Sequence, residues 1–392
     1  MGRLASLRLG LKQLTAERRI LHLTDEVDPI RGTTGTGSVT NPALLMQAEA
    51  LVKAIPHGCN GRLQMNPILK SCLYYGASRV GGLPFFREWF AARAVIILFH
   101  EIQRDCQAEL MTGTSVPLFE YALNWLQRNG WSIVSLDECI AKLASNDRSR
   151  RYAVLTFDDG YRDNVSVALP ILERHNAPFM MYVPTGAPTR SMQSWWLGLR
   201  NLFLSRDNVT IDALGRRFHC SDLRSKMSAF DEVKRWVNQD YRRAVLLAPT
   251  FKQNGISLAA LNDAYFLDER ELSILARHPL ASIGGHTTSH AALPTLEQSS
   301  ARAELADNRR YLENLLQLPV RHVAYPYGAC GLREEHLANE VGFQTAVTTR
   351  EARLYDHKLT PFALPRIGVY NRSDFGARMS GIIEAVQALR SP

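Results

Sequence analysis

The sequence lacks the cysteine arrangements that indicate a disulfide framework or a structural zinc site. Its six cysteines include no Cys-x-x-Cys pair and no regular spacing, so reduced thiols in a cytoplasm are the simplest interpretation. No stretch of about 18 uncharged apolar residues could span a bilayer, and residues 1–20 have no continuous apolar core of a signal peptide. We therefore expect a cytoplasmic protein.

Long runs of a single charge sign are also absent. The 46 Lys and Arg residues exceed the 38 Asp and Glu residues by eight, but they are scattered along the chain. Without a basic run or interleaved aromatic residues, nucleic-acid binding is not expected. The diffuse positive charge favours anionic partners such as acidic glycans or lipid headgroups. No feature predicts a protein partner.

The first 93 residues contain little that predicts a fold. Residues 1–64 form a poorly defined extension with a Gly/Thr/Ser tract at 31–38, which lacks the Gly-Lys-Ser/Thr ending of a phosphate-binding loop. We expect this extension to be dispensable, with Met65 as an alternative start. Residues 65–93 mix aromatic side chains with arginines, which fits either a membrane-surface helix within 69–93 or a helix that covers one end of the next domain.

From residue 94 the pattern alternates between apolar strands and amphipathic helices. The expected strands are 94–99, 131–136, 152–157, 178–183, 281–285, 320–325, 345–348 and 363–369, and the expected helices are 119–128, 164–174, 268–277, 296–316 and 374–389. Strands separated by single helices predict an α/β fold, a deformed (β/α) barrel of seven or eight units over residues 94–392. Residues 184–267 are too long for a connecting loop and are predicted to be a largely helical insertion, with helices near 223–237 and 242–247.

Acidic and histidine side chains follow two of these strands. Asp158 and Asp159 end the strand 152–157, while His286 and His290 follow the strand 281–285. Taken separately, the aspartates could cap a helix and the histidines could be surface or core residues. Taken together, two histidines four residues apart on a helical turn and one aspartate form a three-ligand site for a divalent metal. Zinc is the first choice, with cobalt or nickel as alternatives, and the second aspartate is then free to act as a base.

Three motifs in this order resemble the polysaccharide deacetylases of the NodB-homology type, carbohydrate esterase family 4. The motifs are Thr156-Phe157-Asp158-Asp159-Gly160, His286-Thr287-Thr288-Ser289-His290 and Tyr325-Pro326-Tyr327-Gly328. The resemblance extends from about residue 95 to residue 369. It implies that Asp158 is the catalytic base and that Asp159, His286 and His290 bind the metal. It also implies that residues 325–328 line the substrate groove, with a backbone N–H near Tyr327 that stabilises an oxyanion.

The activity that this resemblance implies is removal of N-acetyl groups from the N-acetylhexosamine units of an oligo- or polysaccharide. Two alternatives are open. The same groups could remove an O-acetyl group or cleave another amide, because neither the metal nor the aspartate distinguishes the leaving group. The protein could also bind a glycan without catalysis.

Two positions depart from the family pattern. The third motif usually has an arginine two residues before its proline, where this chain has Ala324, so Arg366 is a candidate to orient Asp158. The late histidine that serves as general acid has no clear match, and His357 is the candidate, although a solvated loop histidine is the alternative. Trp195 and Trp196 are expected to be exposed and to stack on sugar rings, or else to anchor the insertion in the core.

Overall fold

The computed structural model describes residues 92–104, 110, 113–145, 150–354 and 360–380. The chain divides into the units Met1–Pro56 and His57–Pro392, and all described residues belong to the second unit. The predictions for residues 1–64, for all but the last two residues of 65–93 and for His357 lie outside the described residues.

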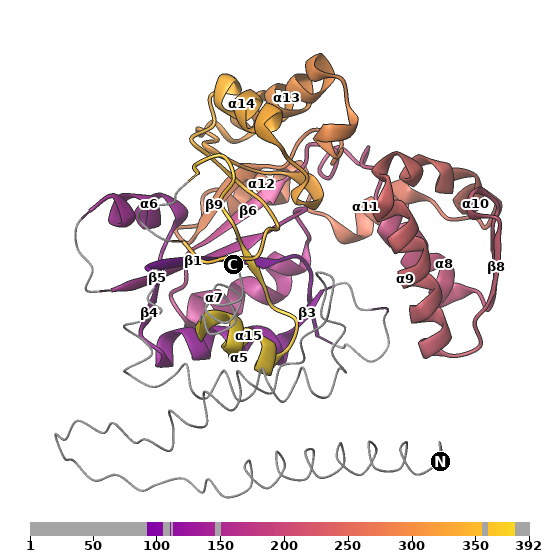
Figure 1. Cartoon of the computed structure of the whole chain (residues 1–392), viewed down its shortest axis with the longest axis horizontal. Coiled ribbons are helices and arrows are strands. Elements are labelled where there is room, and N and C mark those ends of the chain that lie inside the picture. The colour runs from indigo at the N-terminus through magenta and orange to yellow at the C-terminus, as the bar shows by residue number, and fades with distance from the viewer. Residues whose placement is uncertain (1–91, 105–109, 111–112, 146–149, 355–359, 381–392) are drawn as a thin grey trace, which may run out of the picture. The chain divides into compact units, whose positions relative to one another are not determined.

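A parallel eight-stranded sheet forms the centre of this unit (Figure 1). Its strands are β1 (Ala94–Phe99), β4 (Trp131–Ile133), β5 (Arg151–Phe157), β6 (Phe179–Val183), β9 (Ala281–Gly285), β10 (His322–Ala324), β11 (Thr345–Val347) and β12 (Ile367–Gly368). Seven of them follow the order β11-β10-β9-β6-β5-β1-β12, and β4 pairs with the amino-terminal part of β5. Each of these strands was predicted, although most are shorter than expected.

The segment that ends in β12 closes the sheet into a barrel. Leu364 forms a parallel bridge with Val347 at the end of β11, and its carbonyl accepts the Thr348 N–H at 2.9 Å. Only three residues later, Ile367 pairs with Ile97 of β1. One short segment therefore joins the two outer strands, and the predicted deformed (β/α) barrel is confirmed.

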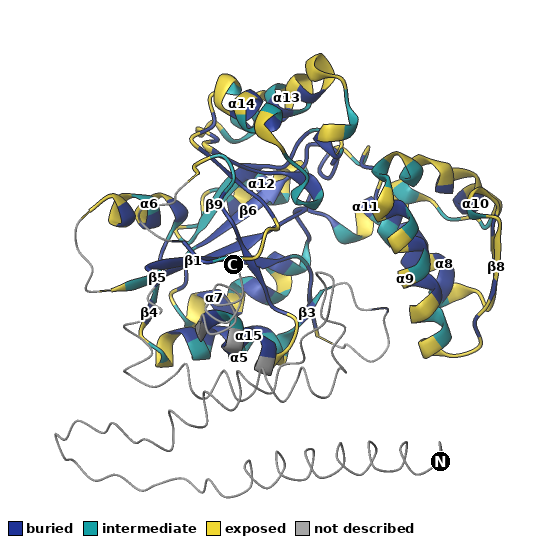
Figure 2. Cartoon of the chain, viewed as in Figure 1, coloured by how far each residue is buried: buried dark blue, intermediate teal, exposed yellow. Residues whose placement is uncertain are grey.

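The strands alternate between two apolar layers, as expected for a parallel sheet that is buried on both faces. In β5, Tyr152 and Val154 point into the barrel and belong to the inner cluster, together with Ala94 and Ile96 of β1. Leu155 and its outward-facing neighbours pack against the surrounding helices. Figure 2 shows the result, with the strands of the central sheet mostly buried and the outer helices exposed on one face.

The outer layer consists of helices that follow the strands. They are α5 (Val116–Arg128), α7 (Leu169–Arg174), α12 (Glu269–Leu275), α13 (Gln298–Leu316), α14 (Leu332–Val341) and α15 (Arg372–Ser380). The predicted helix 164–174 begins as a π-helical turn, η1 (Asn164–Ala168), before it continues as α7. The carboxyl-terminal part of the predicted helix 374–389 lies outside the described residues.

Helix α6 (Leu136–Ala144) was not predicted, and it corrects the end of one strand. The expected strand 131–136 ends at Ile133 because Ser135 caps α6, with its hydroxyl accepting the Glu138 N–H at 3.1 Å. Leu136, Cys139 and Leu143 of this helix belong to the inner cluster. The helix therefore helps to fill the interior of the barrel.

The insertion is largely helical, as predicted, and has its own apolar core. It contains α8 (Trp195–Ser205), β7 (Asn208–Ile211), β8 (Arg216–His219), α9 (Leu223–Gln239), the 3₁₀ helix η3 (Tyr241–Leu247), α10 (Ala248–Gln253) and α11 (Leu258–Tyr265). The antiparallel hairpin of β7 and β8 was not predicted. Val209 and Ile211 are its inward residues, and a four-residue alternation of this kind is a weak signal in a polar segment.

Both ends of the insertion are held close together. The Nη1 of Arg190 donates to the carbonyls of Ala187, Phe266 and Leu267. The side-chain amide of Asn262, which is fully buried, donates to the Met192 carbonyl at 2.7 Å. These bonds join the segment that leaves the barrel to the segment that returns to it, so the insertion has a fixed base.

No helix within the described part of the chain is long and apolar enough to cross a membrane. The cytoplasmic location stays a prediction.

Candidate metal and acid–base site

Asp158 and Asp159 lie at the carboxyl end of β5, where the chain turns sharply. The Asp158 N–H still donates to the Phe99 carbonyl at 3.0 Å, which extends the parallel pairing with β1 by one residue. Asp159 and Gly160 then adopt left-handed backbone conformations, with φ of 74° and 75°. Because the turn begins between the two aspartates, their carboxylates face different partners.

Asp158 faces Arg366, which is 1% exposed. The Nη1 and Nη2 atoms of Arg366 donate to the two carboxylate oxygens of Asp158, each at 2.7 Å. Its Nε donates to the Thr348 carbonyl at 2.9 Å, which fixes the plane of the guanidinium. This two-pronged pairing is the strongest form of charge-assisted hydrogen bond between side chains. The structure therefore brings together two residues that sequence reasoning had joined only as a candidate pair.

The pKa of Asp158 reflects two opposing effects. Burial raises it, because a charged carboxylate loses its hydration, but the charge and hydrogen bonds of Arg366 lower it. The charges of His286 and His100 lower it further, and the net shift is downward. Asp158 is therefore a buried carboxylate that stays ionised and can accept a proton.

The two histidines project from a loop after β9 rather than from a helical turn, and the helical prediction is wrong. Thr287 and His290 have φ of 64° and 60°, which no α-helix contains. Instead of helical bonds, the Thr288 and Ser289 N–H groups each donate to Glu304 of α13 at 2.8 Å. The spacing of four residues brings the imidazoles together through this loop.

Asn308 of α13, one helical turn after Glu304, holds the start of the same loop. It is fully buried, and its Oδ1 accepts the His286 N–H at 3.0 Å. Its amide donates to the Val183 carbonyl and to the Thr185 hydroxyl on the neighbouring strand end. A side chain at Gly285 would collide with Asn308, since an added Cβ would lie 2.5 Å from its Oδ1. Asn308 therefore positions His286 relative to β6.

Asp159, His286 and His290 form a buried cluster with one ligand atom from each residue. The Oδ1 of Asp159 lies 3.4 Å from the Nε2 of His286 and 3.2 Å from the Nε2 of His290. All three ligand atoms lie within 4.8 Å of one another, and the residues are 4%, 1% and 8% exposed. Burial raises the pKa of the Asp159 carboxyl, but His290 and His286 lower it. The net pKa lies well below the usual range.

The donor set fits a divalent metal. The Nδ1 of His286 lies 2.7 Å from the Ala324 carbonyl, so this nitrogen must carry the proton and donate. In the neutral ring the Nε2 then presents a lone pair to the Asp159 Oδ1, a buried oxygen with no hydrogen-bond partner among the described residues. Two hydrogen-bond acceptors that face each other in a buried site repel each other, and a bound cation would remove this repulsion. A set of one aspartate and two histidines is typical of open zinc sites.

The histidine pKa values follow their surroundings. Burial lowers the pKa of His286, but the adjacent Asp159 carboxylate and the charge of Asp158 raise it, with a net increase. For His290 burial prevails and the pKa is lowered. The same carboxylates that favour a proton on His286 would favour a metal cation.

His100 is a residue of the site that sequence reasoning missed. It follows β1 directly, and because Phe99 pairs with Phe157, His100 lies level with Asp158. Its charge lowers the pKa of both Asp158 and Asp159. The signal was present, since His100 is the first polar residue after a buried strand, as Asp158 is after its own strand.

The tryptophans of the insertion are less exposed than expected. Trp195 is 4% exposed, so the expectation of exposure is wrong for it, and it packs in the core of the insertion. Its Nε1 donates to the Tyr327 hydroxyl at 3.0 Å. Trp196 is partly buried, its Nε1 donates to the Tyr161 hydroxyl at 2.7 Å, and its ring lies 5.0 Å from that of His290. Both tryptophans therefore anchor the insertion, and Trp196 does so beside His290.

The four residues of the third motif have different surroundings. Tyr325 is fully buried in the outer apolar layer, and its hydroxyl donates to the Phe362 carbonyl at 3.1 Å. Pro326 is also buried, and Gly328 completes a tight turn with φ of 68°. Tyr327, with φ of 60°, reaches the site, and its ring centre lies 4.8 Å from that of His290. Tyr327 is therefore the residue of this motif whose ring contacts His290.

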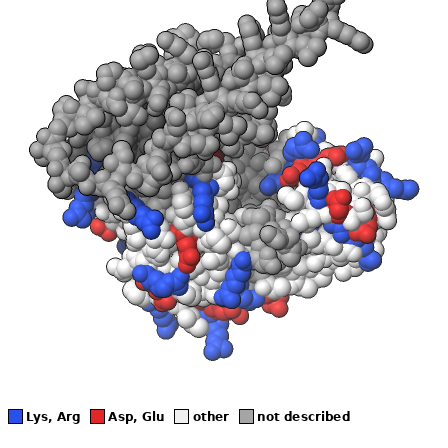
Figure 3. Space-filling view, turned by 90° about the horizontal axis from the view of Figure 1, so that it is seen from below, with Lys and Arg blue, Asp and Glu red and all other residues white. Residues whose placement is uncertain are grey.

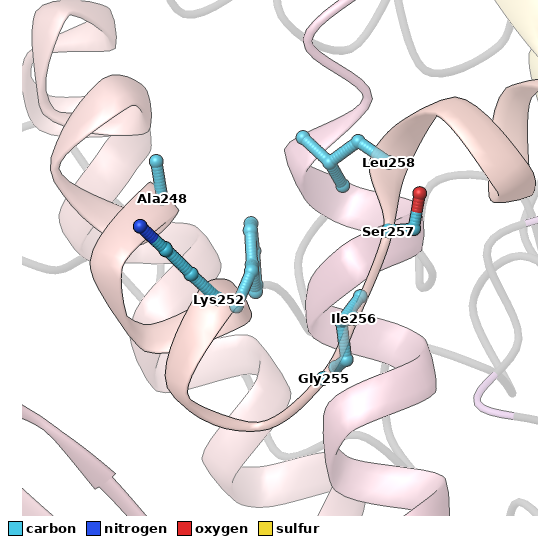
Figure 4. A pocket seen from close by; sticks show the side chains of 7 residues that line it. Ala248, Lys252, Gly255, Ile256, Ser257 and Leu258 are labelled. Carbon is cyan, nitrogen blue, oxygen red and sulfur yellow. The ribbon is translucent and has the colours of Figure 1, made fainter.

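A shallow cleft of about 310 Å³ lies elsewhere, within the insertion (Figure 4). It is lined by Ala248, Phe251, Lys252, Gly255, Ile256, Ser257 and Leu258. None of the predicted site residues contributes to it, so the Asp-His-His cluster and this cleft are separate features.

The described part of the chain is a parallel barrel that carries an Asp-Asp pair and a His pair at the carboxyl ends of its strands. The family model described as polysaccharide deacetylase matches residues 145–210 and 229–346, and the chain belongs to this family. The interval between the two matched stretches lies in the insertion, between β7 and the first turns of α9.

Similar proteins are found among both sequences and structures. The Bacillus subtilis (strain 168) protein YxkH, whose name assigns it provisionally to the polysaccharide deacetylases, is 21% identical over 294 residues, which are 73% of this chain and 76% of YxkH. The Streptococcus pyogenes deacetylase PplD is 18% identical, with a TM-score of 0.48 over 70% of this chain and 92% of PplD. IcaB from Ammonifex degensii is 16% identical, with a TM-score of 0.49 over 74% of this chain and 97% of IcaB.

Proposed function

We propose that the protein is a metal-dependent deacetylase that hydrolyses the N-acetyl group of an N-acetylhexosamine unit in an oligo- or polysaccharide. One observation carries this proposal above all. At the end of β5, Asp158 is paired with Arg366 at 2.7 Å, while its neighbour Asp159 faces His286 and His290. The proposed base and one proposed metal ligand thus leave the same strand as consecutive residues.

Asp159, His286 and His290 would hold the metal, with zinc as the first choice and cobalt or nickel as alternatives. When bound, such a cation polarises the acetyl carbonyl and lowers the pKa of water. The chain contributes the fixed geometry: Ala324 orients His286 through its carbonyl, and Asn308 holds the backbone of the same residue.

Asp158 is the base that removes a proton from the attacking water. Arg366 keeps it ionised and fixes its orientation, yet each carboxylate oxygen retains lone-pair capacity to accept a further hydrogen bond. A general base of this kind contributes about 10² to 10⁴ in rate. A bond then forms between the water oxygen and the carbonyl carbon, and a backbone N–H near Tyr327 assists in stabilising the oxyanion, as the family implies.

Breaking the C–N bond requires a proton on the leaving amine, and His100 is the residue that we assign to deliver it. Its position level with Asp158 places it at the same end of the barrel, and its charge acts on both aspartates. The products are acetate and a free amino sugar. His357, the sequence candidate for this role, lies outside the described residues.

The departure at Ala324 does not favour a glycan-binding protein without catalysis. The arginine that the family places there is replaced in function by Arg366, which approaches Asp158 from β12 instead of β10. Arg366 and Asp158 are separated by 208 positions in the sequence and are joined only by the closed barrel.

Acetate release from N-acetylglucosamine oligomers tests the proposed function. The full-length protein is stripped of metal, reloaded with zinc or cobalt and compared with Asp158→Asn, which keeps the size of the side chain but cannot act as a base. We expect acetate only from the metal-loaded wild type, while the variant retains the same bound zinc. Equal release from the variant, or from the metal-free protein, would contradict the mechanism.

The same assay separates the two histidines. We expect His100→Ala to lower kcat by about 100-fold without loss of zinc, since a missing proton donor typically costs this much. His357→Ala is expected to stay within a few-fold of wild type. The opposite pattern would assign the proton donor to His357.

A further inference from the structure

We propose that the insertion closes one side of the site and restricts the enzyme to the terminal sugar of a glycan, and that Tyr241 sets this limit. The inference rests on the proposed function and adds the position at which an acetylated glycan is attacked. It follows from the contacts between the insertion and the metal ligands.

The insertion contacts a metal ligand directly. The ring of His290 lies 5.0 Å from Trp196 and 4.8 Å from Tyr327. Trp195, next to Trp196 on α8, donates a hydrogen bond to the Tyr327 hydroxyl and so holds Tyr327 against His290. On the His290 side, aromatic side chains therefore occupy the space next to the ligands.

Tyr241 extends this aromatic wall. Its ring stacks on that of Tyr327, with centres 4.1 Å apart and an angle of 17° between the planes. Van der Waals contact between a sugar ring and an aromatic face needs a similar separation, so a sugar and Tyr241 would compete for the same face of Tyr327. Tyr241 thus fills a position that a further sugar unit of a long glycan would otherwise take.

Tyr241 is held in place by its neighbours in the chain. Asp240 before it accepts the Arg242 N–H at 3.1 Å, and its own N–H donates to the Val237 carbonyl, which joins η3 to the end of α9. Arg243 after it donates to the Trp236 carbonyl at 2.9 Å. Because Asp240 and Arg243 are both tied to α9, the backbone on either side of Tyr241 is held in place.

The burial of the site agrees with this picture. His286 and His290 are 1% and 8% exposed, so an acetyl group must approach from the side that the insertion leaves open. A glycan that enters from one side can place its end at the metal, whereas an internal sugar would need to extend in both directions. The geometry therefore favours a terminal N-acetyl sugar.

The position of the removed acetyl group tests this inference. Zinc-loaded full-length protein is incubated with N-acetylglucosamine oligomers of two to six units, labelled at the reducing end, and mass spectrometry of fragments locates each free amine. We expect the wild type to deacetylate one terminal unit at every length. We expect Tyr241→Ala to attack internal units as well and to raise kcat/KM for the hexamer relative to the dimer by about tenfold, equivalent to ~1.4 kcal/mol.

Tyr241→Phe is the matched control, because it keeps the stacked ring and should retain the terminal pattern. Internal deacetylation by the wild type would by itself overturn the inference. The experiment is therefore informative even if Tyr241→Ala fails to fold. An unchanged pattern in a folded Tyr241→Ala protein would also overturn it. Absence of acetate from every oligomer would instead overturn the proposed function, and the inference with it.

Discussion

A single arginine, Arg366, determines the protonation state of the buried Asp158 carboxyl. Asp158 is 3% exposed, and such a group would ordinarily take up a proton at a higher pH than in water. Arg366 reverses this effect through its two hydrogen bonds and its charge. The pair is therefore both a structural contact and the reason why the buried Asp158 carboxyl is ionised.

Replacing Arg366 with methionine tests this role. Burial would then raise the pKa of Asp158 against only the charges of His286 and His100, so the active, ionised form would appear at higher pH. We expect kcat to fall by about 100-fold near neutral pH, with the acid limb of the pH–rate profile shifted upward. Stability should fall by about 3–5 kcal/mol, because a buried charge loses its partner. Kinetics from pH 5 to 9 and denaturant unfolding measure both effects.

Arg366→Lys is the control, because it restores the charge but not the two-pronged geometry. Its acid limb should lie between those of the wild type and Arg366→Met. If the methionine variant keeps the wild-type profile, Arg366 does not set the protonation of Asp158.

Local sequence signals pointed to the proposed base and the proposed metal ligands, and they missed several residues that position these side chains. Asp158, Asp159, His286 and His290 each follow a buried strand, a signal contained in a few neighbouring residues. By contrast, Asn308 and Glu304 lie on the surface-patterned helix α13, and only the fold brings them to the histidine loop. The burial of Trp195 likewise depends on distant partners such as Tyr327.

At the scale of elements, α13 holds the loop that carries His286 and His290. Two of its side chains, one turn apart, replace the hydrogen bonds that a helix would have given the histidine loop. The position of this loop therefore depends on how α13 packs against the end of β9.

Asn308→Ala is expected to weaken zinc binding by about 10- to 100-fold. It removes the acceptor of the His286 N–H but leaves the three proposed ligand side chains unchanged. Competition with a chromophoric chelator measures the zinc Kd. Asn308→Asp is the control, since it keeps the acceptor and should lose less affinity than the alanine variant. An unchanged Kd in folded Asn308→Ala would show that the loop does not need this support.

Elements with long apolar runs were predicted from the sequence, and several elements with a weaker apolar pattern were not. Strands β1, β5 and β9 were found because buried parallel strands are continuous apolar runs. Helix α14 was missed because only a few of its side chains, Leu337 and Ala338 among them, are apolar and buried. Its start is set by Gly331, whose N–H donates to the Glu334 carboxylate at 2.8 Å.

At the scale of the whole molecule, charge is dispersed on the surface and concentrated at a few interior positions. Figure 3 shows Lys and Arg side chains interspersed with acidic and uncharged residues on the face that it presents. Inside, Glu101 and Arg200 form an ion pair with a closest distance of 2.6 Å, and their side chains are 2% and 3% exposed. This pair links the segment after β1 to α8 of the insertion.

Asp163 lies near this ion pair and makes the stability of the protein depend on pH. Burial raises its pKa to about 8 from the usual 3.8, and the charge of Glu101 contributes in the same direction. Between these two values the folded state holds a proton that the unfolded state has released. Stability therefore falls as the pH rises through this window, because the unfolded state binds fewer protons.

Asp163→Asn removes this dependence, since the amide cannot ionise. We expect the variant to gain stability over the wild type progressively from pH 5 to pH 8, by at least about 1 kcal/mol at the upper end, given ~1.4 kcal/mol for each pKa unit. Thermal or denaturant unfolding at several pH values measures the difference. A difference that stays constant with pH would show that Asp163 is ionised in the folded protein.

The closure of the barrel has a consequence for how the enzyme becomes active. The short segment from Leu364 to Gly368 joins β11 to β1 and also carries Arg366. During synthesis the aspartate of β5 emerges from the ribosome long before its arginine, so the carboxylate stays unpaired until the final strand docks. The proposed base therefore acquires its partner only when this late segment docks between β11 and β1, and a product truncated before the segment would leave Asp158 without Arg366.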